Sequence, residues 1–156
     1  MISLNRTKIL FFISCFIFFI IADLYLSNML VKLVSDGFKF TSPILNLFYL
    51  ENTGAAFNIL KDAREALIIA SASAITLVFV YVFKHLKRLS GSTLFWVSML
   101  CSGIFCNMHE RIAIGCVRDF FQLPFVNFPI FNISDIMITL SVTALIIIIL
   151  FKRSRW

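Results

Sequence analysis

Four long apolar stretches constrain this chain more than any other feature, and they cover residues 9–31, 66–83, 90–106 and 134–151. A helix needs about 20 mainly apolar residues to cross a bilayer. The composition agrees, because 60% of the 156 residues are hydrophobic and only 14% are charged, whereas a soluble domain has about half and about a quarter. We therefore predict an all-α membrane protein with four transmembrane helices, forming a single domain over residues 1–156.

Basic residues near the ends of these stretches predict the orientation of the chain. One side of the membrane would carry eight basic residues and no acid: Arg6, Lys8, Lys84, Lys87, Arg88, Lys152, Arg153 and Arg155. Because short cytoplasmic loops carry an excess of Lys and Arg, both termini are expected in the cytoplasm. The net charge of +6 then reflects topology and gives no sign of nucleic-acid binding. A cleaved signal peptide is the alternative for the first stretch, but its apolar core is too long.

Two longer loops, about residues 32–65 and 107–134, face the opposite side. The first contains apolar and aromatic residues at 38–41 and 44–50, a composition typical of short strands. Gly54 then permits close approach of another part of the chain. The second loop is rich in phenylalanine, which is typical of a membrane interface. A small extracytoplasmic β-rich region is therefore expected beside the helices.

Asp119 and Asp135 are the best candidates for chemistry, because acids near a bilayer are costly unless they serve a purpose. They flank the third and fourth apolar stretches, so antiparallel packing would bring them together. Asn107, Arg111 and Asn132 add polar groups at the same depth. The milder alternatives are that Asp119 pairs with its neighbour Arg118, and that Asp135 only stabilises the start of a helix.

Two neighbouring carboxylates can share one proton and activate water against a peptide bond. We expect Asp135 to be the more acidic member, because a helix N-terminus favours its anion, and Asp119 to hold the proton. Asp23 interrupts the first apolar stretch. It is either a water-accessible acid near the interface or a structural partner of the site.

Other catalytic chemistries fit the sequence less well. A serine or cysteine nucleophile needs a nearby base, and His109 is the single histidine predicted on the outer side. His85 lies on the inner side, and the four cysteines form no metal-binding spacing. We therefore expect no metal and no cofactor.

Three blocks of sequence resemble the bacterial lipoprotein signal peptidases, or signal peptidase II. They are Glu51–Phe57 (ENTGAAF), Gly103–Phe120, which includes Asn107, Arg111 and the segment GCVRDF, and Phe131–Asp135 (FNISD). The blocks occur in the family's order, and the resemblance covers nearly the whole chain.

The resemblance implies an aspartic endopeptidase with Asp119 and Asp135 as its catalytic pair. It further implies that Asp23 supports the structure nearby and that five residues line or support the substrate site: Asn52, Gly54, Asn107, Arg111 and Asn132. The implied substrate is a diacylglyceryl-modified prolipoprotein, cut before its lipidated cysteine at the outer face of the bacterial inner membrane. Membrane lipid is the other expected partner, inhibition by globomycin is implied, and we expect a monomer.

Four positions depart from the family pattern. Ser102 and Cys106 stand where glycines are usual, Glu110 replaces an aspartate, and Ser27 replaces a lysine. Two other classes remain open at this point, a transporter subunit using Asp23 and a non-enzymatic scaffold. Both predict that replacing Asp119 or Asp135 by asparagine has little effect.

Overall fold

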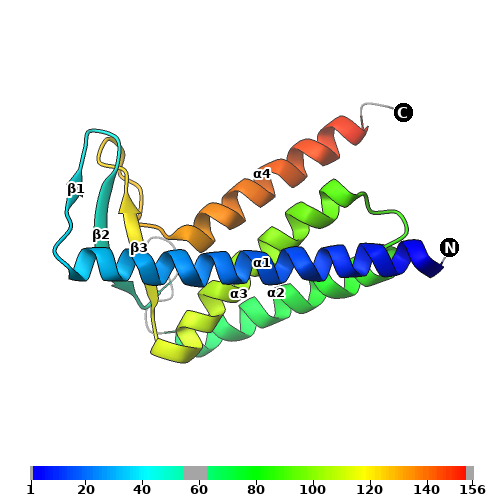
Figure 1. Cartoon of the computed structure of the whole chain (residues 1–156), viewed down its shortest axis with the longest axis horizontal. Coiled ribbons are helices and arrows are strands. Elements are labelled where there is room, and N and C mark those ends of the chain that lie inside the picture. The colour runs from blue at the N-terminus through cyan, green and yellow to red at the C-terminus, as the bar shows by residue number, and fades with distance from the viewer. Residues whose placement is uncertain (1, 55–62, 154–156) are drawn as a thin grey trace.

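The computed structural model describes residues 2–54 and 63–153. Within them the chain forms four long helices and a small sheet at one end (Figure 1). The helices are α1 (Ile2–Ser35), α2 (Arg64–His85), α3 (Gly91–Ile114) and α4 (Ile133–Arg153). Each contains a stretch long and apolar enough to cross a membrane. The predicted all-α membrane architecture is therefore confirmed.

The sheet has three antiparallel strands in the order β1-β2-β3. They are β1 (Phe40–Thr41), β2 (Asn46–Asn52) and β3 (Val117–Gln122). The first two confirm the strands expected in the first loop. The sheet lies at the end of the bundle that also holds the start of α4 (Figure 1). We call this the outer end, and the opposite end, with the N-terminus and the α2–α3 turn, the inner end.

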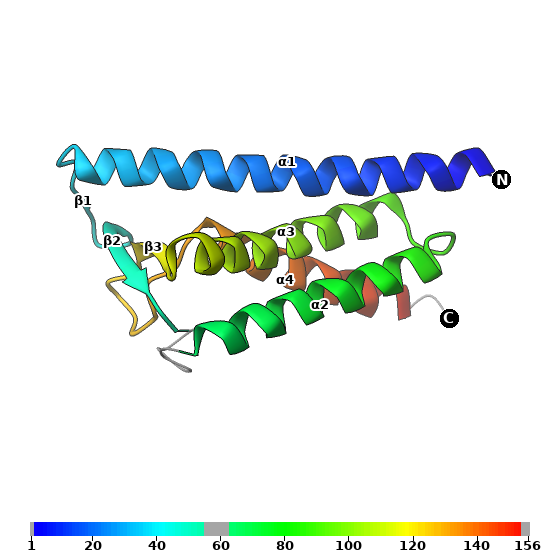
Figure 2. The same ribbon diagram turned by 90° about the horizontal axis from the view of Figure 1, so that it is seen from below.

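Helix α3 is the centre of the bundle and contacts each of the other three helices. Figure 2 shows it between α1 and α2. Its buried residues are mostly small, which lets neighbouring backbones approach closely. The closest approach is at Gly103, where a Cβ atom would lie 2.7 Å from the carbonyl oxygen of Ser134 and 2.8 Å from Cγ1 of Ile138. This contact fixes the start of α4 against α3.

Of the three departures from the family pattern that lie in this helix, Ser102 and Cys106 face α1. The Ser102 hydroxyl is fully buried and lies 2.9 Å from the carbonyl oxygen of Phe16, to which it can donate across to α1. Cys106 is also buried, with its thiol beside Asp23 of α1. Both side chains therefore fill the α1–α3 contact, where glycine would leave space.

The inner end is held by apolar packing and by one lysine. Phe12, Val82, Leu86 and Leu94 form a buried cluster that joins α1, α2 and α3. Next to this cluster along α1, the Lys8 ammonium donates to the carbonyl oxygens of the α2–α3 turn, at Leu86 (3.3 Å), Lys87 (3.2 Å) and Leu89 (2.7 Å). Lys8 thus satisfies the carbonyl of Leu86, the C-cap residue of α2, together with two carbonyls of the turn that follows it.

The structure corrects two expectations about the outer end. Helix α3 continues to Ile114, beyond the expected end at residue 106, so Asn107, Glu110 and Arg111 are helical and not in a loop. It stops at Gly115, whose φ of 87° is a left-handed conformation that glycine adopts easily. Asp119, expected in a loop, lies on β3 and pairs with Leu50 of β2. In both cases buried partners from distant segments stabilise regular structure in a polar stretch.

Candidate active site

Asp119 and Asp135 are brought together around Asn132. The Asn132 side-chain amide donates to Oδ1 of Asp119 at 3.0 Å. The backbone N–H of the same residue donates to Oδ2 of Asp135 at 3.2 Å. Both carboxylates are therefore within hydrogen-bond distance of a single residue, although they come from β3 and α4 respectively.

Asp135 is positioned by the way in which α4 begins. Asn132 immediately precedes the helix, and its Oδ1 accepts from the backbone N–H of Asp135 at 2.8 Å. The Asp135 carboxylate bonds back to the N–H of Asn132. This reciprocal arrangement is a capping box, in which two unpaired N–H groups of the first turn are satisfied together. It fixes the Asp135 carboxylate at the positive end of the helix dipole.

Three asparagines bind the four carboxylate oxygens, through their side-chain amides and the backbone N–H of Asn132. Asn52 Nδ2 donates to Oδ2 of Asp119 at 2.9 Å, and Asn107 Nδ2 donates to Oδ1 of Asp135 at 2.9 Å. Asn132 also donates to Oδ1 of Asn107 at 3.0 Å, so the amides are linked to one another. Because each carboxylate oxygen has two lone pairs, this arrangement leaves capacity for a further donor such as water.

Arg111 connects the helix to the segment after β2. Its guanidinium donates to the carbonyl oxygen of Gly54 at 2.8 Å and to that of Asn107 at 3.0 Å. Gly54 in turn donates its N–H to Oδ1 of Asn52 at 2.9 Å. Arg111 therefore holds the Asn52–Gly54 turn, which places the Asn52 amide on Asp119. The remainder of the ENTGAAF motif, residues 55–57, lies outside the described residues.

Asp119 is 1% exposed, and its environment changes its acidity. Burial raises the pKa of the Asp119 carboxyl to about 7, because desolvation penalises its charged form. The charge of Asp135 adds to this rise in pKa, while the hydrogen bonds from Asn52 and Asn132 oppose it. At neutral pH the Asp119 carboxyl is therefore close to half protonated.

Asp23 is linked to the dyad through Ser134, the neighbour of Asp135. It is 2% exposed, and its Oδ1 accepts from the Ser134 hydroxyl at 2.8 Å. Ser134 precedes Asp135 in the first turn of α4, so Asp23 ties α1 to the start of that helix. Ser27, which replaces the family's usual lysine, is buried on the same helix and brings no positive charge to Asp23.

Glu110 and Arg118 form an ion pair that the sequence did not reveal. The Arg118 Nε donates to Oε1 of Glu110 at 2.8 Å, and the Arg118 backbone N–H donates to Oε2 at 2.8 Å. A further bond joins Arg118 to Oδ1 of Asn28 on α1 at 3.1 Å. The alternative pairing of Asp119 with Arg118 is thus not the arrangement found, because Arg118 points to Glu110. Glu110 and Arg118 lie on either side of the end of α3, so no helical or strand periodicity in the sequence predicts their contact.

A cavity of about 410 Å³ opens beside the two aspartates. Besides the dyad, Asn52, Asn107 and Arg111, its walls are mostly apolar and come from the β3–α4 connection and the outer surface of α4: Leu123, Phe128, Pro129, Ile130, Phe131, Ile136, Ile138, Thr139 and Leu140. A polar floor with apolar walls suits a molecule that is part peptide and part hydrocarbon. His109, the outer base considered above, is exposed and stacks on Phe105.

Comparison with known proteins assigns nearly the whole chain to one family. The family model described as signal peptidase (SPase) II matches residues 15–151. The chain belongs to the signal peptidase II family. The lipoprotein signal peptidase of a Sulfurihydrogenibium species is 31% identical, with 95% of this chain and 96% of that protein covered. The lipoprotein signal peptidase of Lactobacillus gasseri is 32% identical, with 97% and 99% covered.

A solved structure of a bacterial membrane enzyme agrees with this assignment. It superimposes with a TM-score of 0.77 at 27% identity, covering 92% of this chain and 90% of that chain. The matched segment includes all residues of the site. Membership of the signal peptidase II family makes this chain a peptidase of lipoprotein processing and a multi-pass protein of the bacterial inner membrane.

Proposed function

We propose that this chain is an aspartic endopeptidase that removes the signal peptide from diacylglyceryl-modified prolipoproteins by cutting immediately before the lipidated cysteine. The observation that carries the proposal is the placement of two carboxylates, the buried Asp119 and the half-buried Asp135, on one shared residue, Asn132, at the edge of a cavity. Membership of the signal peptidase II family supplies the substrate class. The catalytic roles follow from the chemistry of the pair.

In this mechanism Asp135 is ionised and Asp119 carries the shared proton. The raised pKa of Asp119 and the position of Asp135 at a helix N-terminus both favour that distribution. Asp135 takes a proton from water, and the water oxygen attacks the carbonyl carbon of the scissile bond. Asp119 donates its proton to the carbonyl oxygen, which gives a neutral tetrahedral intermediate.

Breakdown of the intermediate reverses the roles of the two acids. Asp135 passes its proton to the leaving nitrogen, and Asp119 recovers a proton from one hydroxyl group as the carbonyl reforms. The signal peptide leaves with a new carboxyl end, and the cysteine keeps its lipid and gains a free amino group. The three amides hold both carboxylates in place throughout, because they change neither charge nor protonation.

The outer end is proposed to face away from the cytoplasm, with both termini on the cytoplasmic side, and the enzyme is proposed to act as a monomer. The distribution of charge supports this orientation, because the inner end carries basic residues and no acid. The apolar walls of the cavity are evidence for the proposed lipidated substrate, because they can accommodate its hydrocarbon part, which remains near the bilayer.

The decisive experiment uses purified protein in lipid nanodiscs with a diacylated precursor peptide. Cleavage is expected before the modified cysteine, with no loss on metal chelation and with inhibition by globomycin. Asp119→Asn and Asp135→Asn should each abolish cleavage, while Asp36→Asn, at an exposed acid at the end of α1, should retain it. Full activity in either dyad variant, or equal cleavage of the peptide without lipid, would reject the proposal.

A further inference from the structure

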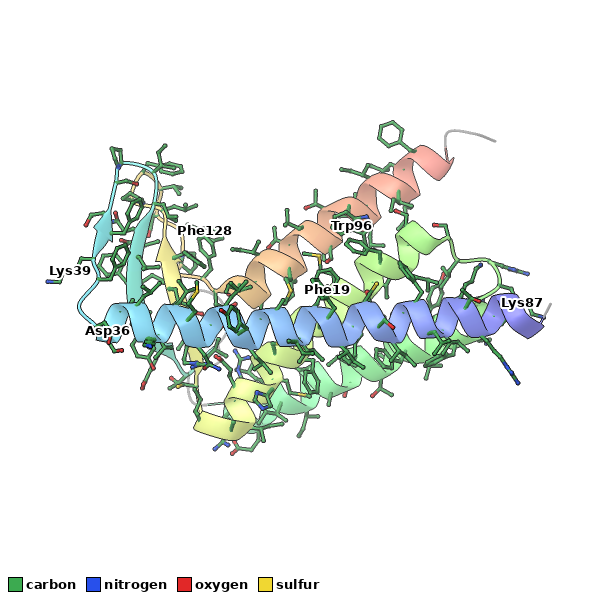
Figure 3. The ribbon with its side chains drawn as sticks, viewed as in Figure 1. Phe19, Asp36, Lys39, Lys87, Trp96 and Phe128 are labelled. Atoms are coloured by element: carbon green, nitrogen blue, oxygen red, sulfur yellow. The ribbon has the colours of Figure 1, made fainter. Side chains whose placement is uncertain are left out.

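The inner end contains a second cavity, of about 680 Å³, far from the dyad. It lies between the first turns of α1 and the end of α2, and its walls include Asn5, Ile9, Phe83, Lys84, Lys87 and Arg88. Figure 3 shows Lys87 at the end of the molecule opposite Asp36, Lys39 and Phe128. Nothing in the peptidase mechanism uses this cavity.

Positive charge at this cavity has no balancing acid. Lys84, Lys87 and Arg88 are exposed. The single ion pair among the described residues is that of Arg118 with Glu110, at the outer end. All the acids of the sequence belong to the outer loops or to the outer parts of the helices. The inner cavity is therefore complementary to an anion.

Lys8 fixes the turn that forms part of the cavity wall. It also offsets the partial negative charge of carbonyl oxygens that would repel an anion. Its ammonium has three donors, and they meet three carbonyl oxygens of the turn, two of which belong to cavity-lining residues. A helix C-terminus normally repels an anion because its free carbonyls carry partial negative charge. Because the C-cap carbonyl of Leu86 and two carbonyls of the turn are bound to Lys8, this opposition is reduced where the remaining cations face an anion.

The apolar walls of the cavity and its position at the membrane surface favour a lipid over a soluble anion. Ile9 and Phe83 contribute apolar walls below the cations, and Phe83 is 46% exposed. This cavity lies where α1 and α2 would leave the bilayer. A phospholipid offers a phosphate at that level and hydrocarbon below it, and basic pockets between membrane helices bind such head groups. A soluble phosphate would gain nothing from the apolar walls.

We propose that the inner cavity binds the phosphate of an anionic phospholipid, held by Lys84, Lys87 and Arg88 with its glycerol and upper acyl region against Ile9 and Phe83. This lipid site is separate from the substrate cavity. It would anchor the α2–α3 turn to the membrane surface opposite the dyad.

The test measures lipid binding to the purified full chain in a neutral detergent, by native mass spectrometry and by thermal stabilisation. The probes are phosphatidylglycerol and phosphatidylcholine with identical acyl chains, and inorganic phosphate. The variant is Lys87→Gln with Arg88→Gln, and the matched control is Lys32→Gln with Lys39→Gln. The control removes the same charge from exposed positions at the outer end.

Phosphatidylglycerol is expected to bind at least about tenfold more tightly than phosphatidylcholine. Each cation near an anionic head group strengthens attraction about fivefold, so the inner variant should lose about 25-fold in phosphatidylglycerol affinity. The outer control should stay within about twofold of the original chain. If the inner variant does not fold, Lys84→Gln, at an exposed site on α2, takes its place with an expected loss of about fivefold.

Three results would overturn the proposal. Equal losses in the inner and outer variants would show diffuse attraction to charge. Stabilisation by inorganic phosphate as large as that by the lipid would assign the cavity to a soluble anion. Equal binding of the two phospholipids would show that the cavity does not recognise negative charge.

Discussion

The two ends of the helical bundle differ in how their charged residues are bound, although at each end one cation donates hydrogen bonds to carbonyl oxygens at or just after the end of a helix. At the outer end Arg64 donates to the carbonyl oxygens of Arg111 (2.7 Å) and Ile112 (3.0 Å), in the last turn of α3. At the inner end Lys8 does the same for the α2–α3 turn.

The remaining cations of the two ends are in different situations. At the outer end the two arginines next to the dyad, Arg111 and Arg118, are bound to oxygen atoms of the protein, whereas Lys32 and Lys39 are exposed. At the inner end Lys84, Lys87 and Arg88 are exposed around a cavity. The arginines next to the dyad are therefore held within the protein and position groups for chemistry, whereas the cations around the inner cavity are open to a ligand from the surroundings.

Outside the two aspartates themselves, the largest effect is expected from Asn132→Ala, which would break the outer network at the residue shared by both carboxylates. We expect kcat to fall by about 100-fold, because small displacements of catalytic groups have effects of this size. The matched control is Asn46→Ala, at a buried asparagine of β2 that bonds Gln122 and not the dyad. Peptide cleavage by both variants measures the difference, and equal losses would contradict the role of Asn132.

The pH dependence of stability and of kcat/KM should report the ionisation of Asp119. Its pKa of about 7 lies above the ordinary value of 3.8, so the folded state holds a proton that the unfolded state loses. The contribution to stability is therefore complete below pH about 3.8 and is lost as the pH rises through about 7. Likewise, kcat/KM should fall about tenfold per pH unit above pH about 7.

Asn52→Ala sharpens this prediction, because the hydrogen bond from Asn52 lowers the pKa of Asp119. Removing that bond should move the alkaline limb of the kcat/KM profile to higher pH. Arg6→Gln, at an exposed inner residue, serves as the control and should leave the limb in place. A limb that does not move in Asn52→Ala would assign the ionisation to another group.

A smaller effect is expected from Gly103→Ala, at the close contact between α3 and α4. The new methyl group would meet the carbonyl oxygen of Ser134 and force α4 outward. Overpacking of this kind costs about 1–3 kcal/mol of stability. Gly91→Ala is the control, because a Cβ at Gly91 meets nothing within 4 Å. Thermal unfolding in detergent should separate the two, and identical melting curves would argue against a tight contact.

The smallest effect is expected from Lys8→Gln at the inner end. Loss of a charged donor to three carbonyls should lower stability by about 1–2 kcal/mol. We expect kcat to stay within about twofold, because the dyad lies at the other end. A large loss of kcat in this variant, with stability unchanged, would contradict the separation of the two ends.

Local patterns in the sequence were enough to predict the helices, the first two strands and the candidate dyad. Apolar length marks a membrane span, and alternating or aromatic stretches mark a strand. The third strand was missed because the segment Val117–Gln122 is short and has charged residues at its second and third positions. Its structure depends on pairing with β2, a segment far away along the chain.

The polar end of α3 was missed for a related reason. Asn107, Glu110 and Arg111 resemble a loop when only composition is considered, but each finds a partner in another element. Hydrogen-bond partners in other elements make such buried residues compatible with a packed helix. The sequence could indicate that these residues share a depth, but not which atoms they bind.

The left-handed turn at Gly115 has a consequence for how this enzyme can vary. It joins α3 to β3 with almost no intervening chain, so the number of residues between Arg111 and Asp119 is set by geometry at both ends. Because neighbouring residues of a strand point to opposite faces, inserting or deleting one residue after Gly115 would turn the carboxylate away from the cavity. Length changes in this interval are therefore compatible with catalysis only in pairs.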